Sequence, residues 1–297
     1  MTMVLLLTVG TAGCGGQPDG SVPGSQSGHD PSSSNRASAP PSAGAESVRV
    51  FAVGDLGNKG DRDDTIARLI ADYAPDAFFA LGDTVYPNAS QDNYDAFYDE
   101  SYGILNQIVW PVPGNHDYRK GSIDDYLAYF DEHAPHFPGT TYYASDLGSW
   151  RIYALDSEIG ESAPGDAMYD WLEADLTDHP SACIAAMWHK PIYTIGSKAY
   201  DEGAMRPIYD LLLAKGVDLV LTGHDHNYQR WEVDGITYFV VGTGGKSRYR
   251  LHPPADGFAY GSDQVNGALE LELGPSGGSY VFHTLDDAQL DPGTFTC

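Results

Sequence analysis

The sequence contains few positively charged residues. It has 16 Lys and Arg against 42 Asp and Glu, and its formal net charge at pH 7 is -26. Nucleic-acid binding depends on clustered basic side chains that neutralise phosphates, so this deficit argues against DNA or RNA as a partner and favours small ligands. The excess of acidic residues is typical of a well-hydrated surface that keeps a protein soluble.

Cysteine is scarce as well, with three residues in the chain. Neither Cys183 nor Cys297 has the cationic neighbours that would stabilise a thiolate, which disfavours a catalytic cysteine. If the protein is exported, these two residues can form one disulfide between the end of the chain and the predicted strand before Trp188. The alternative is one buried thiol and one frayed terminal thiol.

The N-terminal apolar run, residues 3–9, is too short to cross a bilayer as a helix. Small residues and Cys14 follow it, as in an export signal, and residues 11–14 resemble a bacterial lipoprotein processing site at which Cys14 receives the lipid. A secreted protein cut near Gly16 and a misassigned start codon are the alternatives. The next stretch has almost nothing apolar to bury, which predicts a disordered tether.

We therefore predict three parts: an export segment of the signal or lipoprotein type over residues 1–14, a Ser/Gly/Pro-rich tether over 15–46, and a single domain over 47–297. We expect a monomer outside the cytoplasm, either secreted or on the cell surface. A lipid at Cys14 would be its only membrane contact.

Beyond the tether, β and α patterns alternate. Strands separated by helices require crossover connections, so we expect an α/β fold with a largely parallel sheet. Nearer the C-terminus, the runs 236–241, 268–273 and 279–282 predict a second, more antiparallel sheet. The strands expected in the first sheet are 48–53, 76–81, 108–110, 150–155, 182–187 and 217–221, and the expected helices include 65–70, 167–173 and 205–213.

Polar segments follow five of these strands. Ligands of open α/β sheets bind outside the carboxyl ends of the strands, so these segments should meet. They supply carboxylates, an amide, a phenol and imidazoles, the ligand types of a dinuclear metal centre that hydrolyses phosphoesters. Glycines before the ligands suit sharp turns and close backbone approach. The segments are Gly54-Asp55, Gly82-Asp83 with Tyr86, 114–117, Trp188-His189 and 223–226.

Two further features lie outside these segments. The glycines of residues 242–245, followed by Lys246, lack P-loop spacing and predict a tight turn beside the metal centre. Three tyrosines, Tyr193, Tyr228 and Tyr249, are candidates for a substrate rim.

The order GD…GDxxY…GNHD…H…GHxH resembles the calcineurin-like metallophosphoesterases, and within them the purple acid phosphatases. Two positions favour that subgroup: Asp55-Leu56-Gly57 replaces the Asp-x-His of many other members, and Tyr86 stands where the subgroup has an iron ligand. The resemblance covers nearly all of the chain from Val48 onward. It implies a four-layer α-β-β-α sandwich with two mixed sheets and a dinuclear metal site at the carboxyl ends of the strands.

The resemblance also implies a ligand set. Carboxylate and phenolate oxygens suit a hard trivalent iron, whereas imidazoles and an amide suit a divalent ion. The expected cofactors are therefore two metal ions, Fe(III) and a divalent Zn, Fe or Mn. Carried over position by position, the ligands are Asp55, Tyr86 and His226 for the first metal, Asn115, His189 and His224 for the second, and Asp83 as the bridge.

By the same resemblance, Asn115 and His116 contact the substrate phosphate, and His116 protonates the leaving group. Asp117 would orient or charge the imidazole of His116, a pairing that raises the pKa of a general acid. Lys198 stands about nine residues after His189, where small purple acid phosphatases tend to carry a second acid histidine. Lysine binds phosphate as a point charge but is a poorer acid, which leaves an acidic pH optimum open.

The activity implied is the hydrolysis of phosphate monoesters among small organic esters. A phosphodiesterase or nucleotide-cleaving enzyme on the same scaffold is the alternative, because Lys198 replaces a histidine and the sequence leaves the substrate rim undefined. A non-catalytic lipoprotein that binds metal or phosphate is disfavoured, because both ligand sets and His116 exceed what binding alone requires.

Overall fold

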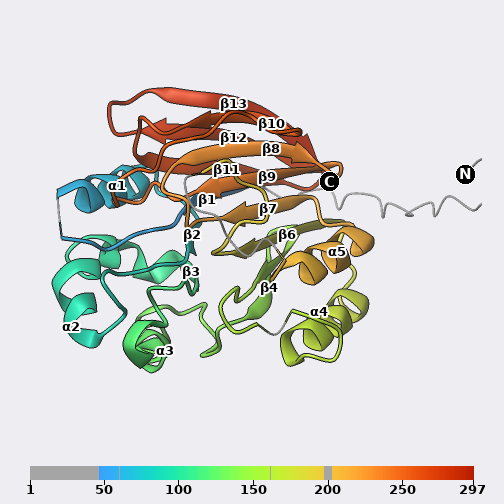
Figure 1. Cartoon of the computed structure of the whole chain (residues 1–297), viewed down its shortest axis with the longest axis horizontal. Coiled ribbons are helices and arrows are strands. Elements are labelled where there is room, and N and C mark those ends of the chain that lie inside the picture. Colours follow the sequence, from blue (N-terminus) through green and yellow to red (C-terminus); the bar gives the residue numbers. More distant parts are fainter. Residues whose placement is uncertain (1–46, 60, 161, 197–202) are drawn as a thin grey trace, which may run out of the picture. The chain divides into compact units, whose positions relative to one another are not determined.

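The computed structural model describes residues 47–297 apart from 60, 161 and 197–202. The predicted export segment with Cys14, the predicted tether over 15–46, and Lys198 lie outside the described residues. Within the described part, two mixed β-sheets form the centre of the domain. Helices α1 to α3 lie on one side of them and α4 and α5 on the other (Figure 1). The predicted fold class is confirmed.

The first sheet has six strands in the order β13-β12-β11-β1-β2-β3. β1, β2 and β3 run parallel, and β11 joins the other edge of β1 in antiparallel register with Val50 opposite Leu271. β12 and β13 extend this edge as antiparallel neighbours. The strands are β1 (Val48–Val53), β2 (Ala77–Leu81), β3 (Val109–Val112), β11 (Gly267–Gly274), β12 (Gly277–Thr284) and β13 (Gln289–Thr296).

The second sheet has seven strands in the order β10-β8-β9-β7-β6-β5-β4. β5, β6, β7 and β9 run parallel in its middle, and β4, β8 and β10 are antiparallel to their neighbours. The strands are β4 (Tyr143–Leu147), β5 (Trp150–Ala154), β6 (Cys183–Trp188), β7 (Leu219–Thr222), β8 (Tyr228–Val233), β9 (Ile236–Val241) and β10 (Phe258–Ser262).

Helices connect the parallel strands. Helix α5 shows how local sequence sets the ends of an element: Pro207 lies in its first turn, and Gly216 closes it in the left-handed conformation with φ 82°. The helices are α1 (Asp61–Asp72), α2 (Gln91–Asn93), the π-turn η1 (Tyr94–Tyr98), the 3-10 segments η2 (Tyr102–Ile108) and η3 (Arg119–Gly121), α3 (Ile123–His133), α4 (Ala167–Asp178) and α5 (Arg206–Lys215).

Among the described residues, no helix combines the length and apolarity needed to span a bilayer.

The sheet membership predicted from the sequence was wrong in two respects. The six strands expected in one parallel sheet divide equally between the two sheets. In addition, the run 236–241, expected to pair with the C-terminal strands, forms β9 and pairs in parallel with β7. An apolar run predicts that a strand is buried, but it does not say which neighbour the strand pairs with.

The core has two parts that correspond to the two faces of the second sheet. Ala185 and Met187 of β6 belong to the larger cluster, which also contains side chains of the first sheet. Ile184 and Ala186 point the opposite way, into a cluster with α4 and α5. This alternation is the period-two pattern of a strand whose two faces are both covered, as a layered sandwich requires.

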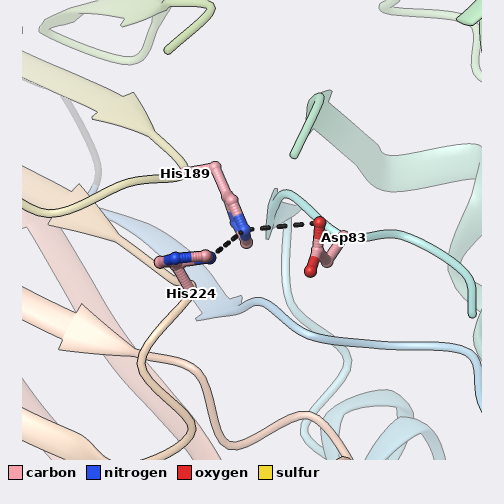
Figure 2. A group of neighbouring side chains, drawn as sticks. All are labelled: Asp83, His189 and His224. Carbon is pink, nitrogen blue, oxygen red and sulfur yellow. Dashed lines mark hydrogen bonds and ion pairs between the residues drawn. The ribbon is translucent and has the colours of Figure 1, made fainter. Parts of the chain in front are cut away.

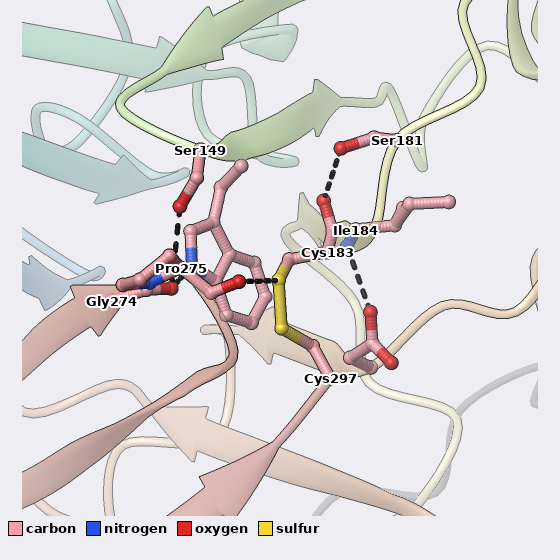
Figure 3. Close-up of a disulfide and its surroundings, with 9 residues drawn as sticks. Ser149, Ser181, Cys183, Ile184, Gly274, Pro275 and Cys297 are labelled. Atoms are coloured by element: carbon pink, nitrogen blue, oxygen red, sulfur yellow. Dashed lines mark hydrogen bonds between the residues drawn. A yellow bond between two sulfur atoms is a disulfide. The ribbon is translucent and has the colours of Figure 1, made fainter. Parts of the chain in front are cut away.

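A disulfide joins the two sheets. Cys183 begins β6, and Cys297 directly follows β13; their Cα atoms lie 5.0 Å apart, within the usual range for a bridge (Figure 3). Of the two alternatives for these residues, the disulfide is confirmed. It ties Cys297 to β6, an inner strand of the other sheet.

Candidate metal centre

Loops at the carboxyl ends of strands from both sheets bring the predicted ligands together. Three of these residues, Asp55, Asp83 and His224, have positive φ values of 62°, 49° and 67°. Residues other than glycine rarely adopt this conformation, and it concentrates at functional sites. The first sheet contributes Asp55 after β1, Asp83 and Tyr86 after β2, and Asn115 after β3, and the second contributes His189 after β6 and His224 and His226 after β7.

Two of the glycines let the ligands approach one another. A Cβ on Gly82 would lie 2.5 Å from His189 Nδ1, and a Cβ on Gly114 would lie 2.5 Å from Asp83 Oδ1. No side chain fits in either place, and Gly82 also has φ 81°. The predicted role of these glycines in close packing at the site is therefore confirmed.

The first group of ligands surrounds the Tyr86 hydroxyl. This hydroxyl lies 2.8 Å from both Asp55 Oδ1 and Asp83 Oδ2, and 3.3 Å from His226 Nε2. His226 Nε2 in turn lies 3.0 Å from Asp55 Oδ1. Two carboxylates, a phenol and an imidazole thus point at one small volume, as the ligands of a single metal ion do.

The second group shares Asp83 with the first. His189 Nε2 lies 3.3 Å from Asp83 Oδ1, and His224 Nδ1 lies 3.0 Å from His189 Nε2 (Figure 2). One ligand atom from each of these three residues falls within 4.8 Å of the others. Asn115 follows Gly114, whose backbone packs against Asp83 and His189, and its buried Oδ1 has no hydrogen-bond partner among the described residues. A buried amide oxygen without a partner costs free energy, and a metal ion would satisfy it.

Backbone carbonyls hold two of the imidazoles in place. His189 Nδ1 lies 2.8 Å from the Leu81 carbonyl oxygen, and His226 Nδ1 lies 2.7 Å from the Ser247 carbonyl oxygen. Because a carbonyl only accepts, each Nδ1 carries a proton, and each Nε2 is directed at the centre. This is the usual support of a metal-ligating histidine.

The electrostatics of the centre favour cations. Burial by itself would raise the pKa of Asp55 and of Asp83, but His226 and His189 outweigh it and lower both. Conversely, burial would lower the pKa of His189, but Asp83 raises it to about 10. Burial and the two carboxylates raise the pKa of Tyr86 well above its ordinary value. The buried carboxylates therefore remain ionised and attract positive charge.

The observed partners of the Asp117 carboxylate differ from the expected one, His116. Its buried carboxylate accepts hydrogen bonds from the Gly114 N–H at 2.7 Å and from the Thr84 N–H and hydroxyl at 3.1 and 2.7 Å. His116 Nδ1 instead lies 2.8 Å from the Pro87 carbonyl oxygen, and burial lowers the pKa of His116. Asp117 is expected to orient or charge this imidazole; in the structure its carboxylate is directed inward at Thr84 and Gly114, and the Pro87 carbonyl is the partner of His116 Nδ1.

The sequence reasoning missed Ser247 and Thr84. Ser247 acts through its carbonyl, which every residue type has, so no sequence signal could have revealed it. The segment 242–245 lies beside the centre as predicted: the chain bends from Gly244 onward, and the Gly244 N–H donates to the Gly54 carbonyl at 3.0 Å. Among the rim candidates, Tyr228 is fully buried and cannot line a rim, whereas Tyr249 stacks on His226.

The two-sheet fold, with two ligand groups that share Asp83 at the ends of its strands, is the architecture of the two-metal phosphoesterases. In agreement, a family model described as calcineurin-like phosphoesterase matches residues 48–228. The match spans more than half of the chain, and the protein belongs to the calcineurin-like phosphoesterase family.

The similar proteins include purple acid phosphatases and a tartrate-resistant acid phosphatase. Purple acid phosphatase 15 of Arabidopsis thaliana is 28% identical over 242 residues, covering 66% of this chain and 45% of the relative. Tartrate-resistant acid phosphatase type 5 of Rattus norvegicus is 27% identical over 280 residues, covering 78% of this chain and 85% of the relative. The structure of purple acid phosphatase PPD1 from yellow lupin has the same fold, with a TM-score of 0.70 and 19% identity over 84% of this chain and 54% of that chain. The chain spans about half the length of the plant relatives that it matches.

Proposed function

We propose that this protein is a two-metal hydrolase of small phosphate monoesters that acts outside the cytoplasm. The observation that carries the proposal is the position of Asp83 between two ligand groups, with Tyr86 on one side and His189 on the other. A shared carboxylate is what a dinuclear centre requires, and a single structural ion would need only one of these groups.

The two groups differ in donor chemistry. Asp55, Tyr86 and His226 present two oxygen donors and one imidazole, a set that suits Fe(III), and Asp83 would bridge. Asn115, His189 and His224 would hold a divalent Zn, Fe or Mn ion. When bound, such a pair supplies Lewis-acid charge to a phosphoryl group and lowers the pKa of water. The unpartnered Asn115 Oδ1 supports the second position.

His116 is placed to exchange a proton with the leaving group. Its side chain is 12% exposed and its Nε2 lies 4.0 Å from Asp83 Oδ2, at the mouth of the centre. The Pro87 carbonyl accepts from Nδ1–H, so Nε2 faces the ester oxygen and donates to it when the ring carries a second proton. Asn115 would contact the same phosphate. Asp117 supports the turn that carries both residues, and Lys198 is proposed as a further positive charge for the phosphate.

The overall acidity does not oppose phosphate binding. Two metal cations would outweigh the local carboxylates at contact distance, while the net charge of -26 would still repel large polyanions. The disulfide between Cys183 and Cys297 supports an oxidising compartment, and therefore export. A cell-surface location through Cys14 would be tested with Cys14→Ser, which should move the protein from the membrane fraction into the soluble fraction.

The deciding measurement is kcat/KM of the metal-loaded protein for p-nitrophenyl phosphate and for bis(p-nitrophenyl) phosphate. Preference for the monoester supports the proposal, and preference for the diester supports a phosphodiesterase. Replacement His116→Ala should lower kcat about 100- to 10,000-fold at unchanged metal content. The matched control is His252→Ala, an exposed histidine remote in sequence from every ligand segment.

A separate variant tests the metal assignment. Asn115→Ala should lower the content of the divalent ion, because it removes one of that ion's proposed ligands. It should not lower the stability of the metal-free protein, because the Asn115 Oδ1 makes no hydrogen bond among the described residues. Full metal content in this variant contradicts the ligand assignment. Absence of turnover on either nitrophenyl ester by the metal-loaded wild type supports a non-catalytic binding protein.

A further inference from the structure

A short cationic segment borders the metal centre. Residues 246–250, Lys-Ser-Arg-Tyr-Arg, hold three of the 16 basic residues of a chain with a formal net charge of -26. The segment follows β9 and the turn 242–245, where a Cβ on Gly242 would lie 2.7 Å from Asp55 Oδ2. The local excess of positive charge therefore lies beside the proposed phosphate site.

Three contacts fix this segment against the ligands. Lys246 Nζ lies 3.9 Å from the centroid of the Tyr86 ring. The Ser247 carbonyl oxygen accepts the hydrogen bond from His226 Nδ1 at 2.7 Å. Tyr249 stacks on His226, with ring centroids 3.9 Å apart and planes inclined by 14°, and its N–H donates to the His226 carbonyl at 2.9 Å. The segment is thus held in a defined position next to the centre.

A pocket of about 420 Å³ opens on the same segment. Ser247 and Tyr249 both line this pocket and contact His226, so the pocket lies next to the proposed ligand His226. Its volume falls in the range of small-molecule sites. The lining residues are Ser247, Arg248, Tyr249, Arg250, Asp263 and Gln264.

The charges in the pocket sum to a positive value. Hydrogen bonding from the Leu251 N–H, with help from the charge of Arg250, holds the pKa of Asp263 below its ordinary value. The ionised Asp263 offsets one guanidinium group. Arg248 donates through Nη1 to Asn266 Oδ1 at 3.1 Å, and this amide acceptor carries no charge of its own.

We propose that this pocket binds a second anionic group of the substrate, so that the protein prefers phosphomonoesters whose alcohol part carries a carboxylate or a further phosphate. The inference rests on the proposed function, which places the ester phosphate at the metal centre. Guanidinium groups match the paired oxygens of such anions. An ester without a second anion gains nothing from Arg248 and Arg250.

The test uses two esters that differ in one group. Glycerol 2-phosphate has a hydroxymethyl group where 2-phosphoglycerate has a carboxylate. For the metal-loaded full-length protein, we expect kcat/KM to be about 10- to 100-fold higher for 2-phosphoglycerate, the value of one charge-assisted hydrogen bond. The double substitution Arg248→Gln with Arg250→Gln should reduce this preference to about twofold or less through a loss on 2-phosphoglycerate. Arg206→Gln, an exposed arginine of α5, is the matched control and should retain the preference.

Two results overturn the inference: equal kcat/KM for the two esters in the wild type, and a preference that survives the double substitution. A loss of equal size on both esters would also contradict it, because it would place the arginines at the ester phosphate instead. If neither ester is hydrolysed, the proposed function fails. In that case the dissociation constants of the two intact esters are measured by calorimetry. The inference holds if the wild type binds 2-phosphoglycerate more tightly than glycerol 2-phosphate and the double variant does not.

Discussion

The ammonium group of Lys246 lies over the ring of Tyr86, with Nζ 3.9 Å from the ring centroid. The Tyr86 hydroxyl is close to Asp55 and Asp83, and burial together with these carboxylates raises the pKa of the phenol well above its ordinary value. Binding as a phenolate therefore requires positive charge nearby. Lys246 supplies such charge from the face of the ring, where the electron-rich π system attracts a cation.

This contact predicts a change in colour. The protein loaded with Fe(III) should absorb visible light through charge transfer from the Tyr86 phenolate, and Tyr86→Phe should abolish the band. Positive charge beside the phenolate lowers the energy of its donor orbitals, so Lys246→Met should move the band to longer wavelength. Spectra recorded at equal iron content measure the shift, with Lys215→Met at the end of α5 as the control.

Two outcomes of these spectra would contradict the assignment. A colourless iron-loaded wild type would exclude Tyr86 as an iron ligand. A band that keeps its wavelength in Lys246→Met would show that the ammonium group does not influence the phenolate.

The sequence predicted the strands that carry the ligands better than it predicted their partners. The run 48–53 matches β1 in full, because a buried parallel strand is a continuous apolar run that ends where the chain turns. The edge strand β13, Gln289–Thr296, was missed, since it is largely exposed and contains Pro292-Gly293. The pairing of β9 with β7 depends on how the sheets stack, which no single run specifies.

At the site, too, the sequence predicted some features and not others. The ligands could be predicted because each is a metal-binding residue type shortly after a strand. The contacts that hold these ligands in place could not be predicted. Ser247 holds His226 through a backbone carbonyl, and Lys246 reaches Tyr86 across the fold from a loop after β9. Such contacts depend on tertiary structure and leave no local pattern in the sequence.

Asp156 follows β5 and is completely buried, with the Tyr118 hydroxyl 2.6 Å from Oδ2 and the Glu158 N–H donating to Oδ1 at 2.8 Å. Burial raises the pKa of Asp156 to about 6. The unfolded value is ~3.9. Because the folded pKa is the higher one, the stabilising contribution is fully present below about pH 4 and is lost as the pH rises through about 6.

Replacement of Asp156 by Asn removes this titration. Relative to the wild type, the free energy of unfolding of Asp156→Asn should rise by about 3 kcal/mol between about pH 4 and about pH 8, since the pKa shift is roughly 2 units. Urea unfolding at several pH values measures the difference. Asp210→Asn, on the exposed side of α5, is the control. A constant difference between Asp156→Asn and the wild type would contradict a raised pKa.

The disulfide stabilises the fold at a place remote from the centre. It connects residues separated by 114 positions, and a bridge that closes so long a loop should contribute about 2–4 kcal/mol. We expect Cys297→Ser to lower the free energy of unfolding by about that amount in urea. Reductant should bring the wild type to the stability of the variant and leave the variant unchanged.

Metal content separates a stabilising role from a role at the site. Cys183 is the first residue of β6 and His189 follows the last, so the bridge and the ligand lie at opposite ends of one strand, about 20 Å apart. Cys297→Ser should therefore bind both metals as fully as the wild type in the absence of urea. If folded Cys297→Ser binds less metal than the wild type, removal of the bridge changes the position of His189 at the other end of β6. If reductant does not change the stability of the wild type, the two thiols are not joined.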